Sequence, residues 1–122
     1  MSAFASLADL NVLPIWGGVV ARAVEGREMT FAVVELGPHT IVAPHQHPNE
    51  QMGMVVRGSA QFTVGSERRV LHAGDTYRIT GGILHDVVAG ADGCVAIDVF
   101  APVREDWRTF TPEPPRPPDW PR

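Results

Sequence analysis

Apolar and polar residues alternate in short segments over most of the chain, and residues typical of turns separate the segments. The segments rich in β-branched and aromatic residues are 19–24, 29–36, 53–58, 60–64, 68–72, 76–79, 84–88 and 94–100. The breaks between them hold turn-forming pairs and triplets at residues 25–26, 65–66, 73–75, 81–82 and 91–93. Many short strands at near-regular spacing predict an all-β domain, either an antiparallel sandwich or a small barrel.

The two ends of the chain depart from this pattern. Residues 3–10 predict only a short helical turn. The last segment, residues 111–122, holds 6 of the 11 prolines, which can neither donate to a sheet ladder nor continue a helix. We therefore expect one domain over residues 1–110 and a polyproline-II-like tail over residues 111–122. We expect this tail to pack on its own domain, with Trp120 as an anchor, or on a dimer mate, or to fray; the alternative is a proline-rich ligand for a partner protein.

Length and composition narrow the function classes. A chain of 122 residues is long enough for one domain with a core. A formal net charge of −4 argues against a nucleic-acid partner, and no apolar run reaches the length of a membrane span. The first ten residues lack the pattern of a secretory signal. The single cysteine, Cys94, rules out an internal disulfide and favours a cytoplasmic location.

Three of the 5 histidines stand at spacings that suit a metal site. On a strand, His45 and His47 would point to the same face about 7 Å apart, close enough to reach one ion. Gln51 opens the next segment and His85 begins a later one, and a small barrel can bring such positions together at its mouth. The histidine pair by itself leaves a metal role and a structural role open. His39 and His72 fit no ligand spacing and are expected at turns or on the surface.

The spacing around these residues resembles the two motifs of the cupin superfamily. The first motif, G-x5-H-x-H-x(3,4)-E-x6-G, is matched by His45-x-His47-x3-Gln51-x6-Gly58, with Gln51 in the glutamate position and His39 in place of the opening glycine. Glu50 is one residue out of register and would face the other side of a strand. The second motif, G-x5-P-x-G-x2-H-x3-N, is matched at Gly74, Gly82 and His85, with Thr80 and Ala89 as departures. The resemblance implies a single small jelly-roll β-barrel of antiparallel strands.

Residues 14–107 further resemble the small bacterial cupins of pectin and alginate degradation. In that family a metal-bound barrel converts 4,5-unsaturated monouronates to linear keto forms. The resemblance implies a metal shell of His45, His47, Gln51 and His85, and it places the family's Asp-x-Phe-x3-Arg signature on Asp98, Phe100 and Arg104. Ala101 and Val103, where the family more often has serine and proline, are local departures.

The implied shell indicates what one bound divalent ion would do. Three neutral imidazoles and a neutral amide leave the 2+ charge uncompensated, which favours anionic ligands and Lewis-acid chemistry. Nickel, zinc, manganese and iron all suit such a shell.

Asp98 and Phe100 share one face of their strand with Cys94 and Ala96. We expect Asp98 to transfer a proton as a general acid or base, with a salt bridge to Arg104 as the alternative. Arg104 is a candidate to bind and orient the carboxylate of an anionic sugar, unless it pairs with Glu105 or Asp106 in a solvated loop. Phe100 would form an apolar wall against the sugar ring, unless it is simply a core residue.

Several residues on the predicted strands have open placements. Arg22 and Arg78 could each reach the pocket or lie outside it. Met52 and Met54 alternate with Gln51 and are expected in the core or in an interface. The apolar stripe of Val95, Ile97 and Val99 should pack in the core or against a second subunit, and we expect a homodimer.

Other functions remain compatible with the same residues. A polyketide cyclase of the cupin type would act on aromatic chains in a more apolar pocket. A metal-dependent dioxygenase would consume oxygen. A non-catalytic cupin would bind a sugar or a metal without turnover.

Overall fold

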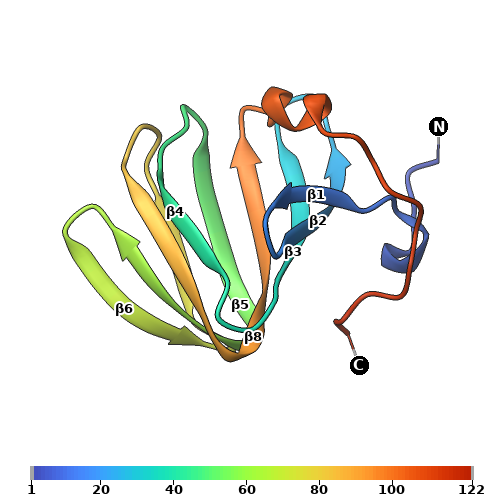
Figure 1. Ribbon diagram of the computed structural model, residues 1–122. Coiled ribbons are helices and arrows are strands. Elements are labelled where there is room, and N and C mark those ends of the chain that lie inside the picture. The colour runs from blue at the N-terminus through green and yellow to red at the C-terminus, as the bar shows by residue number, and fades with distance from the viewer. Residues whose placement is uncertain (1, 122) are drawn as a thin grey trace.

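Two long strands, β5 (Glu50–Val64) and β8 (His85–Ala101), pair along most of their length and form the centre of a curved sheet. A computed structural model describes residues 2–121 of the chain. Within these residues the remaining strands are β1 (Leu13–Trp16), β2 (Val19–Glu25), β3 (Thr30–Leu36), β4 (Ile41–His45), β6 (Glu67–His72) and β7 (Thr76–Ile79). The sheet runs β1-β2-β3-β8-β5-β6, with β4 paired to β8 and β7 paired to β5. All pairs are antiparallel and the sheet curls into an open barrel (Figure 1), so the all-β barrel prediction is confirmed.

The prediction of separate strands over residues 53–58 and 60–64, and over 84–88 and 94–100, was wrong. Each pair of segments is one continuous strand, β5 or β8, and the predicted turn at residues 91–93 lies inside β8. Gly58 and Gly93 both have positive φ, and a side chain on Gly58 would overlap the carbonyl oxygen of Gly93. Glycine therefore lets β5 and β8 approach closely where their register shifts. Both strands can bend there and remain paired with each other.

The sequence pattern also missed β1, because Pro14 lies in its middle. Proline is tolerated there because β1 is at the edge of the sheet, where one side of the strand needs no donor. The short helical turn expected within residues 3–10 is the 3-10 helix η1 (Leu7–Asp9). A second 3-10 helix, η2 (Glu105–Thr109), follows β8 at the end of the barrel (Figure 1). No helix among the described residues is long and apolar enough to cross a membrane.

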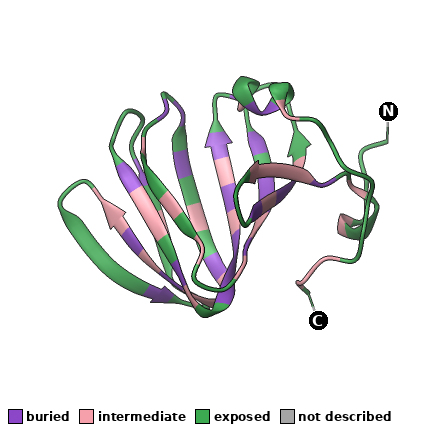
Figure 2. Ribbon diagram, in the orientation of Figure 1, coloured by how far each residue is buried: buried purple, intermediate pink, exposed green. Residues whose placement is uncertain are grey.

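Buried and exposed residues alternate along the strands, as the banding in Figure 2 shows. One buried cluster fills the closed end of the barrel and includes Leu36, Val55, Phe62, Leu71 and Cys94. A second cluster brings Phe100 and Trp107 together with small residues of β2 and β3. The side chains of the barrel interior therefore form a packed floor, and the site described below lies above it.

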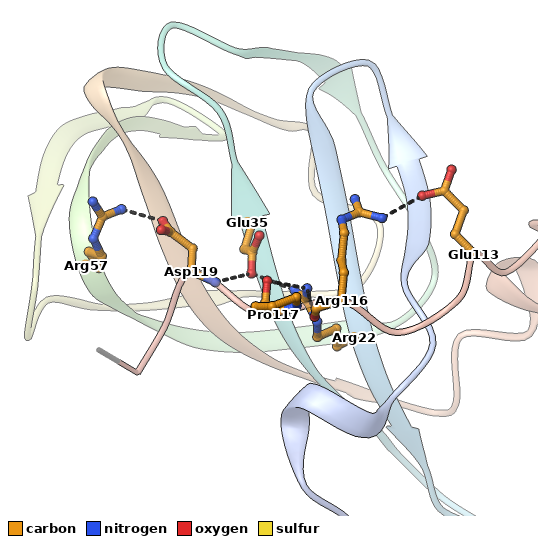
Figure 3. A network of polar contacts seen from close by, with 7 residues as sticks. All are labelled: Arg22, Glu35, Arg57, Glu113, Arg116, Pro117 and Asp119. Atoms are coloured by element: carbon orange, nitrogen blue, oxygen red, sulfur yellow. Dashed lines mark hydrogen bonds and ion pairs between the residues drawn. The ribbon is translucent and has the colours of Figure 1, made fainter.

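The proline-rich tail packs on the outer face of its own barrel (Figure 3). Val12 and Glu113 form a β-bridge, and Arg22 donates through Nη2 to the carbonyl oxygens of Arg116 and Pro117. Further along, the backbone N–H of Asp119 donates to Glu35, 3.0 Å away. Trp120, the expected anchor, is only partly buried. Apart from the backbone bridge to Val12, these polar contacts of the tail involve the charged side chains of Arg22 and Glu35 in the sheet.

Asp119 also explains the burial of Val95 on the outer face of β8. Its carboxylate forms an ion pair with Arg57, and Glu35 and Arg57 are the two cross-strand partners of Val95. The tail therefore crosses the sheet above Val95. Arg22 is 1 % exposed and is bound to Glu35 beneath the tail, which places it outside the barrel interior.

Beyond the tail, several apolar side chains on the outer face of the sheet are exposed. Met52 and Met54 are 48 % and 37 % exposed, so they are not core residues. Phe31 and Met52 are both cross-strand partners of Val99, which places all three on one face. A homodimer that uses this face stays a prediction.

Candidate metal centre and active site

The three histidines of the cupin motifs meet at the mouth of the barrel. His45 is the last residue of β4, His85 is the first residue of β8, and the two are cross-strand partners. His47 does not share a strand with His45, contrary to the prediction, because β4 ends before it. The loop that carries His47 is held by Asn49, whose side-chain amide donates to the carbonyl oxygens of Pro102 and Val103. One ring nitrogen from each histidine nevertheless lies within 4.8 Å of the others.

Backbone carbonyls set the same tautomer in all three imidazoles. The Nδ1 atoms of His45, His47 and His85 lie 2.8, 3.0 and 2.8 Å from carbonyl oxygens of residues two positions away. A carbonyl oxygen only accepts, so each Nδ1 carries the proton and each Nε2 keeps a free lone pair. This is the arrangement that orients histidine for metal binding through Nε2.

Gln51 completes the cluster, and Glu50 does not take part. Gln51 is buried, whereas Glu50 is exposed, as the motif spacing predicted. The Gln51 side-chain Nε2 donates to Oδ1 of Asp98 at 3.0 Å, which turns its Oε1 toward His47. This Oε1 lies 3.1 Å from Nε2 of His47, so two lone pairs face each other.

These contacts fit a bound cation. Two facing acceptors repel each other unless a positive charge lies near both. Nε2 of His85 is buried without a hydrogen-bond partner in residues 2–121, which is costly unless a ligand uses its lone pair. Three imidazole nitrogens and an amide oxygen are ligands that a divalent transition metal accepts. The three-histidine site is therefore suited to hold a metal ion.

The electrostatic surroundings keep two of these histidines neutral. Burial lowers the pKa of His85 to about 4. Burial also lowers the pKa of His47, and the positive charge of Arg104 lowers it further. Metal ligation requires deprotonated Nε2 atoms, so the site is ready to bind an ion at neutral pH.

Acid should destabilise the metal-free protein through His85. Below pH 6.5 an unfolded chain protonates this imidazole, whereas the folded chain resists protonation until about pH 4. The unfolded state then binds more protons, so the free energy of unfolding decreases as the pH falls through this window. Urea unfolding of chelator-treated protein between pH 7 and pH 4 should show a smaller decrease for His85→Gln than for wild type. Parallel curves would contradict the assigned pKa, because all other groups titrate in both proteins.

Asp98 lies inside the barrel next to this cluster. Its side chain is buried and accepts hydrogen bonds from Gln51 and from the hydroxyl of Tyr77, 2.5 Å away. Burial raises the pKa of Asp98, although both hydrogen bonds and the charge of Arg104 oppose the rise. The predicted alternative, a salt bridge between Asp98 and Arg104, is not formed.

Arg104 pairs with Asp106, which was one of the two partners named in the alternative prediction for it. That prediction also placed Arg104 in a solvated loop, and this part was wrong. Its Nε and Nη2 donate to the two carboxylate oxygens of Asp106 at 3.0 and 2.8 Å. The guanidinium carbon lies 4.7 Å from the ring centre of Phe100 and 4.8 Å from that of Trp107. The side chain is 11 % exposed and lines the cavity. Asp106 and the two rings therefore fix where the positive charge lies.

The cavity that these residues surround is small and mostly apolar. It has a volume of about 120 Å³ and is lined at its mouth by His45, His85, Gln51, Asp98, Phe100 and Arg104. Below them its wall is made of aliphatic and aromatic side chains. Phe100 contacts the edge of His47, with ring centres 5.8 Å apart. Neither Arg22 nor Arg78 lines this cavity.

Sequence reasoning missed two residues of the site. Tyr77 reaches Asp98 because β7 pairs with β5 on the side opposite β8, and Trp107 supports Arg104 from η2. The alternation in residues 76–79 could have placed Tyr77 on an inward face, but no local pattern gives its register against Asp98.

The fold and the site together define a small metal-binding β-barrel. Residues 32–100 match the family described as Cupin domain, and the chain belongs to the cupin family.

Three relatives show how this cupin compares with known proteins. The pectin degradation protein KdgF of Dickeya dadantii (strain 3937) is 32% identical over 81 residues, which cover 66% of this chain and 74% of that protein. The structure of KdgF from Halomonas sp. shares the fold with a TM-score of 0.79 at 24% identity, over 87% of this chain and 98% of that one. An RmlC-like cupin from Shewanella frigidimarina NCIMB 400 has a TM-score of 0.81 at 25% identity, over 88% and 96% of the two chains.

Proposed function

We propose that this protein converts 4,5-unsaturated monouronates derived from pectin or alginate to their linear keto forms. The observation that carries the proposal is the position of Asp98, a buried carboxylate beside the three-histidine cluster with Arg104 at the same cavity. The similarity to a relative named as a pectin degradation protein supports the choice of substrate class. One divalent transition metal, with nickel, zinc, manganese and iron as candidates, would be held by His45, His47, His85 and Gln51.

The reaction is an isomerisation that needs only proton transfers. The hydroxyl proton on the first ring carbon leaves, a carbonyl forms there, and the bond from this carbon to the ring oxygen breaks. The ring oxygen takes up a proton and becomes the enol oxygen on the fifth carbon. The enol then gains a proton at the fourth carbon and loses one from its oxygen, which gives the ketone. No oxidant, reductant or net water is consumed.

Asp98 is the group that moves these protons. A carboxylate whose pKa is raised by burial exchanges protons more readily near neutral pH than an exposed aspartate does. A metal ion bound at the histidines would act as a Lewis acid that polarises a sugar oxygen. Much of the cavity wall is apolar, and such low-dielectric surroundings strengthen the electrostatic interactions of the reacting groups.

Arg104 and Phe100 bind the substrate. Asp106 occupies the Nε–Nη2 edge of the guanidinium, which leaves Nη1 without a partner among the described residues. A uronate carboxylate can bind there, because a guanidinium and a carboxylate form charge-assisted hydrogen bonds. Phe100, buried between His47 and Arg104, supplies the apolar surface for the sugar ring.

Ketonisation can be measured directly by the loss of ultraviolet absorbance of the conjugated double bond. Metal-loaded protein should accelerate this loss for a 4,5-unsaturated monouronate freshly released by a lyase, and proton NMR should show the linear keto product. Chelator-treated protein is the control. A rate equal to the spontaneous one would contradict the proposal. Calorimetric binding without turnover would then favour a non-catalytic cupin, and oxygen uptake by iron-loaded protein would favour a dioxygenase.

A further inference from the structure

Both hydrogen bonds to Asp98 end on the same carboxylate oxygen. The hydroxyl of Tyr77 donates to Oδ1 at 2.5 Å, and the side-chain amide of Gln51 donates to Oδ1 at 3.0 Å. The other oxygen, Oδ2, accepts no hydrogen bond from the described residues. It is also not one of their polar atoms that are both inaccessible to solvent and without a hydrogen-bond partner. Since Asp98 lines the cavity, Oδ2 is the oxygen left open to it.

Tyr77 is held in place by the register of three strands. Gly53 of β5 is the cross-strand partner of Asp98 on one side and of Tyr77 on the other. A side chain on Gly53 would overlap both the hydroxyl of Tyr77 and Oδ1 of Asp98, so the absence of one lets these two groups meet. The Tyr77 ring also packs against Phe62, with ring centres 4.5 Å apart. The phenol therefore has little freedom to turn away from the carboxylate.

We propose that Tyr77, seated over Gly53, is a positioning residue that fixes Oδ1 of Asp98 and leaves Oδ2 as the oxygen that moves the proton. This inference rests on the proposed function, because it assigns a role within that reaction. Two donors on one oxygen prevent the carboxylate from rotating about its Cβ–Cγ bond. A reacting group held in one orientation loses less rate to misalignment than a group that rotates.

Tyr77 itself does not exchange the substrate's proton. Burial and the charge of Asp98 raise the pKa of its phenol well above the usual range, so the hydroxyl stays protonated and remains a donor. Gln51 complements it from the metal side, because its oxygen faces His47 while its amide group holds Asp98. The orientation of Asp98 is thereby linked to the residues that would hold the metal.

The kinetic test is Tyr77→Phe, which keeps the ring against Phe62 and removes only the hydroxyl. We expect kcat to fall by about tenfold to a hundredfold, with KM and metal content changed by less than about twofold. Thr76→Val, which removes an exposed hydroxyl from the neighbouring position of β7, should retain wild-type kcat. In the Asp98→Asn background, Tyr77→Phe should have no further effect, because it acts through Asp98. Wild-type kcat in Tyr77→Phe, or a full additional loss in the double variant, would overturn the proposal.

A structural arm separates this inference from the proposed function. Crystal structures of metal-loaded protein should show Oδ1 bound to Tyr77 in wild type and a rotated or doubly oriented Asp98 carboxylate in Tyr77→Phe. An unchanged carboxylate in the variant would overturn the positioning role, whether or not the wild type turns over uronates. If the wild type lacks ketonising activity and the carboxylate does rotate, the proposed reaction is wrong and the positioning of Asp98 by Tyr77 stands.

Discussion

Replacing Asp98 by asparagine should lower kcat for uronate ketonisation by about 10²–10⁴-fold, the usual contribution of a positioned general acid or base. Asparagine keeps the size of the side chain and an oxygen that accepts from Tyr77 and Gln51, but it cannot take up and release a proton. The three histidines do not contact Asp98 through any hydrogen bond, so they should still bind the ion. Metal content measured by plasma mass spectrometry should therefore equal that of the wild type.

The matched control is Asp92→Asn, which removes the charge of an exposed aspartate on the same strand. It should leave both kcat and metal content unchanged. Asp98→Ala offers a second comparison, since it also frees the amide of Gln51 and should be no more active than Asp98→Asn. Activity of Asp98→Asn within a few-fold of wild type would refute the proton-transfer role while leaving the metal site intact.

Removing His85 should abolish stable metal binding. Its Nε2 is buried and has no hydrogen-bond partner among the described residues, and His85→Ala deletes one of three imidazoles that converge at the mouth of the barrel. Wild-type protein dialysed against a limiting divalent metal should retain about one ion per chain, and the variant should retain less than about a tenth of that. Activity should fall to the spontaneous rate.

Metal-linked stability gives a second readout for the same variant. An ion that binds only the folded chain at a hundred times its Kd adds about 2.7 kcal/mol to the free energy of unfolding. Wild-type Tm should therefore rise on addition of metal, whereas the Tm of His85→Ala should not. His72→Ala, which removes an exposed histidine outside the cluster, should behave as the wild type does. A metal-dependent rise in Tm of His85→Ala equal to that of wild type would contradict the site.

The parts of the site that sequence reasoning predicted are those that depend on local spacing. Gln51 and Glu50 are neighbours, and a shift of one residue on a strand exchanges the two faces, so the motif spacing could distinguish them. The spacing also singled out His45, His47 and His85, although it wrongly placed the first two on one strand. Asp98 and Phe100 were predicted to share a face, and both line the cavity.

The parts that were missed depend on contacts between distant segments. Tyr77 reaches Asp98 only because β7 and β8 pair with opposite sides of β5 at Gly53. The continuity of β5 and β8 depends on the close approach of Gly58 to Gly93, and each segment alone looks like the end of a strand. Neither of these two contacts between distant residues can be predicted from the composition of the segments that form it.

Side-chain alternation and motif spacing are properties of neighbouring residues, so the all-β class of the fold, the cupin motifs and the set of candidate metal ligands could be predicted from the order of residues alone. Three other features required the folded structure: which oxygen of Asp98 is free, where Asp106 and Trp107 hold the charge of Arg104, and which face the tail covers. These features arise from strand register and from packing between residues far apart in the chain. The contacts that stabilise these features form only when the distant strands have paired.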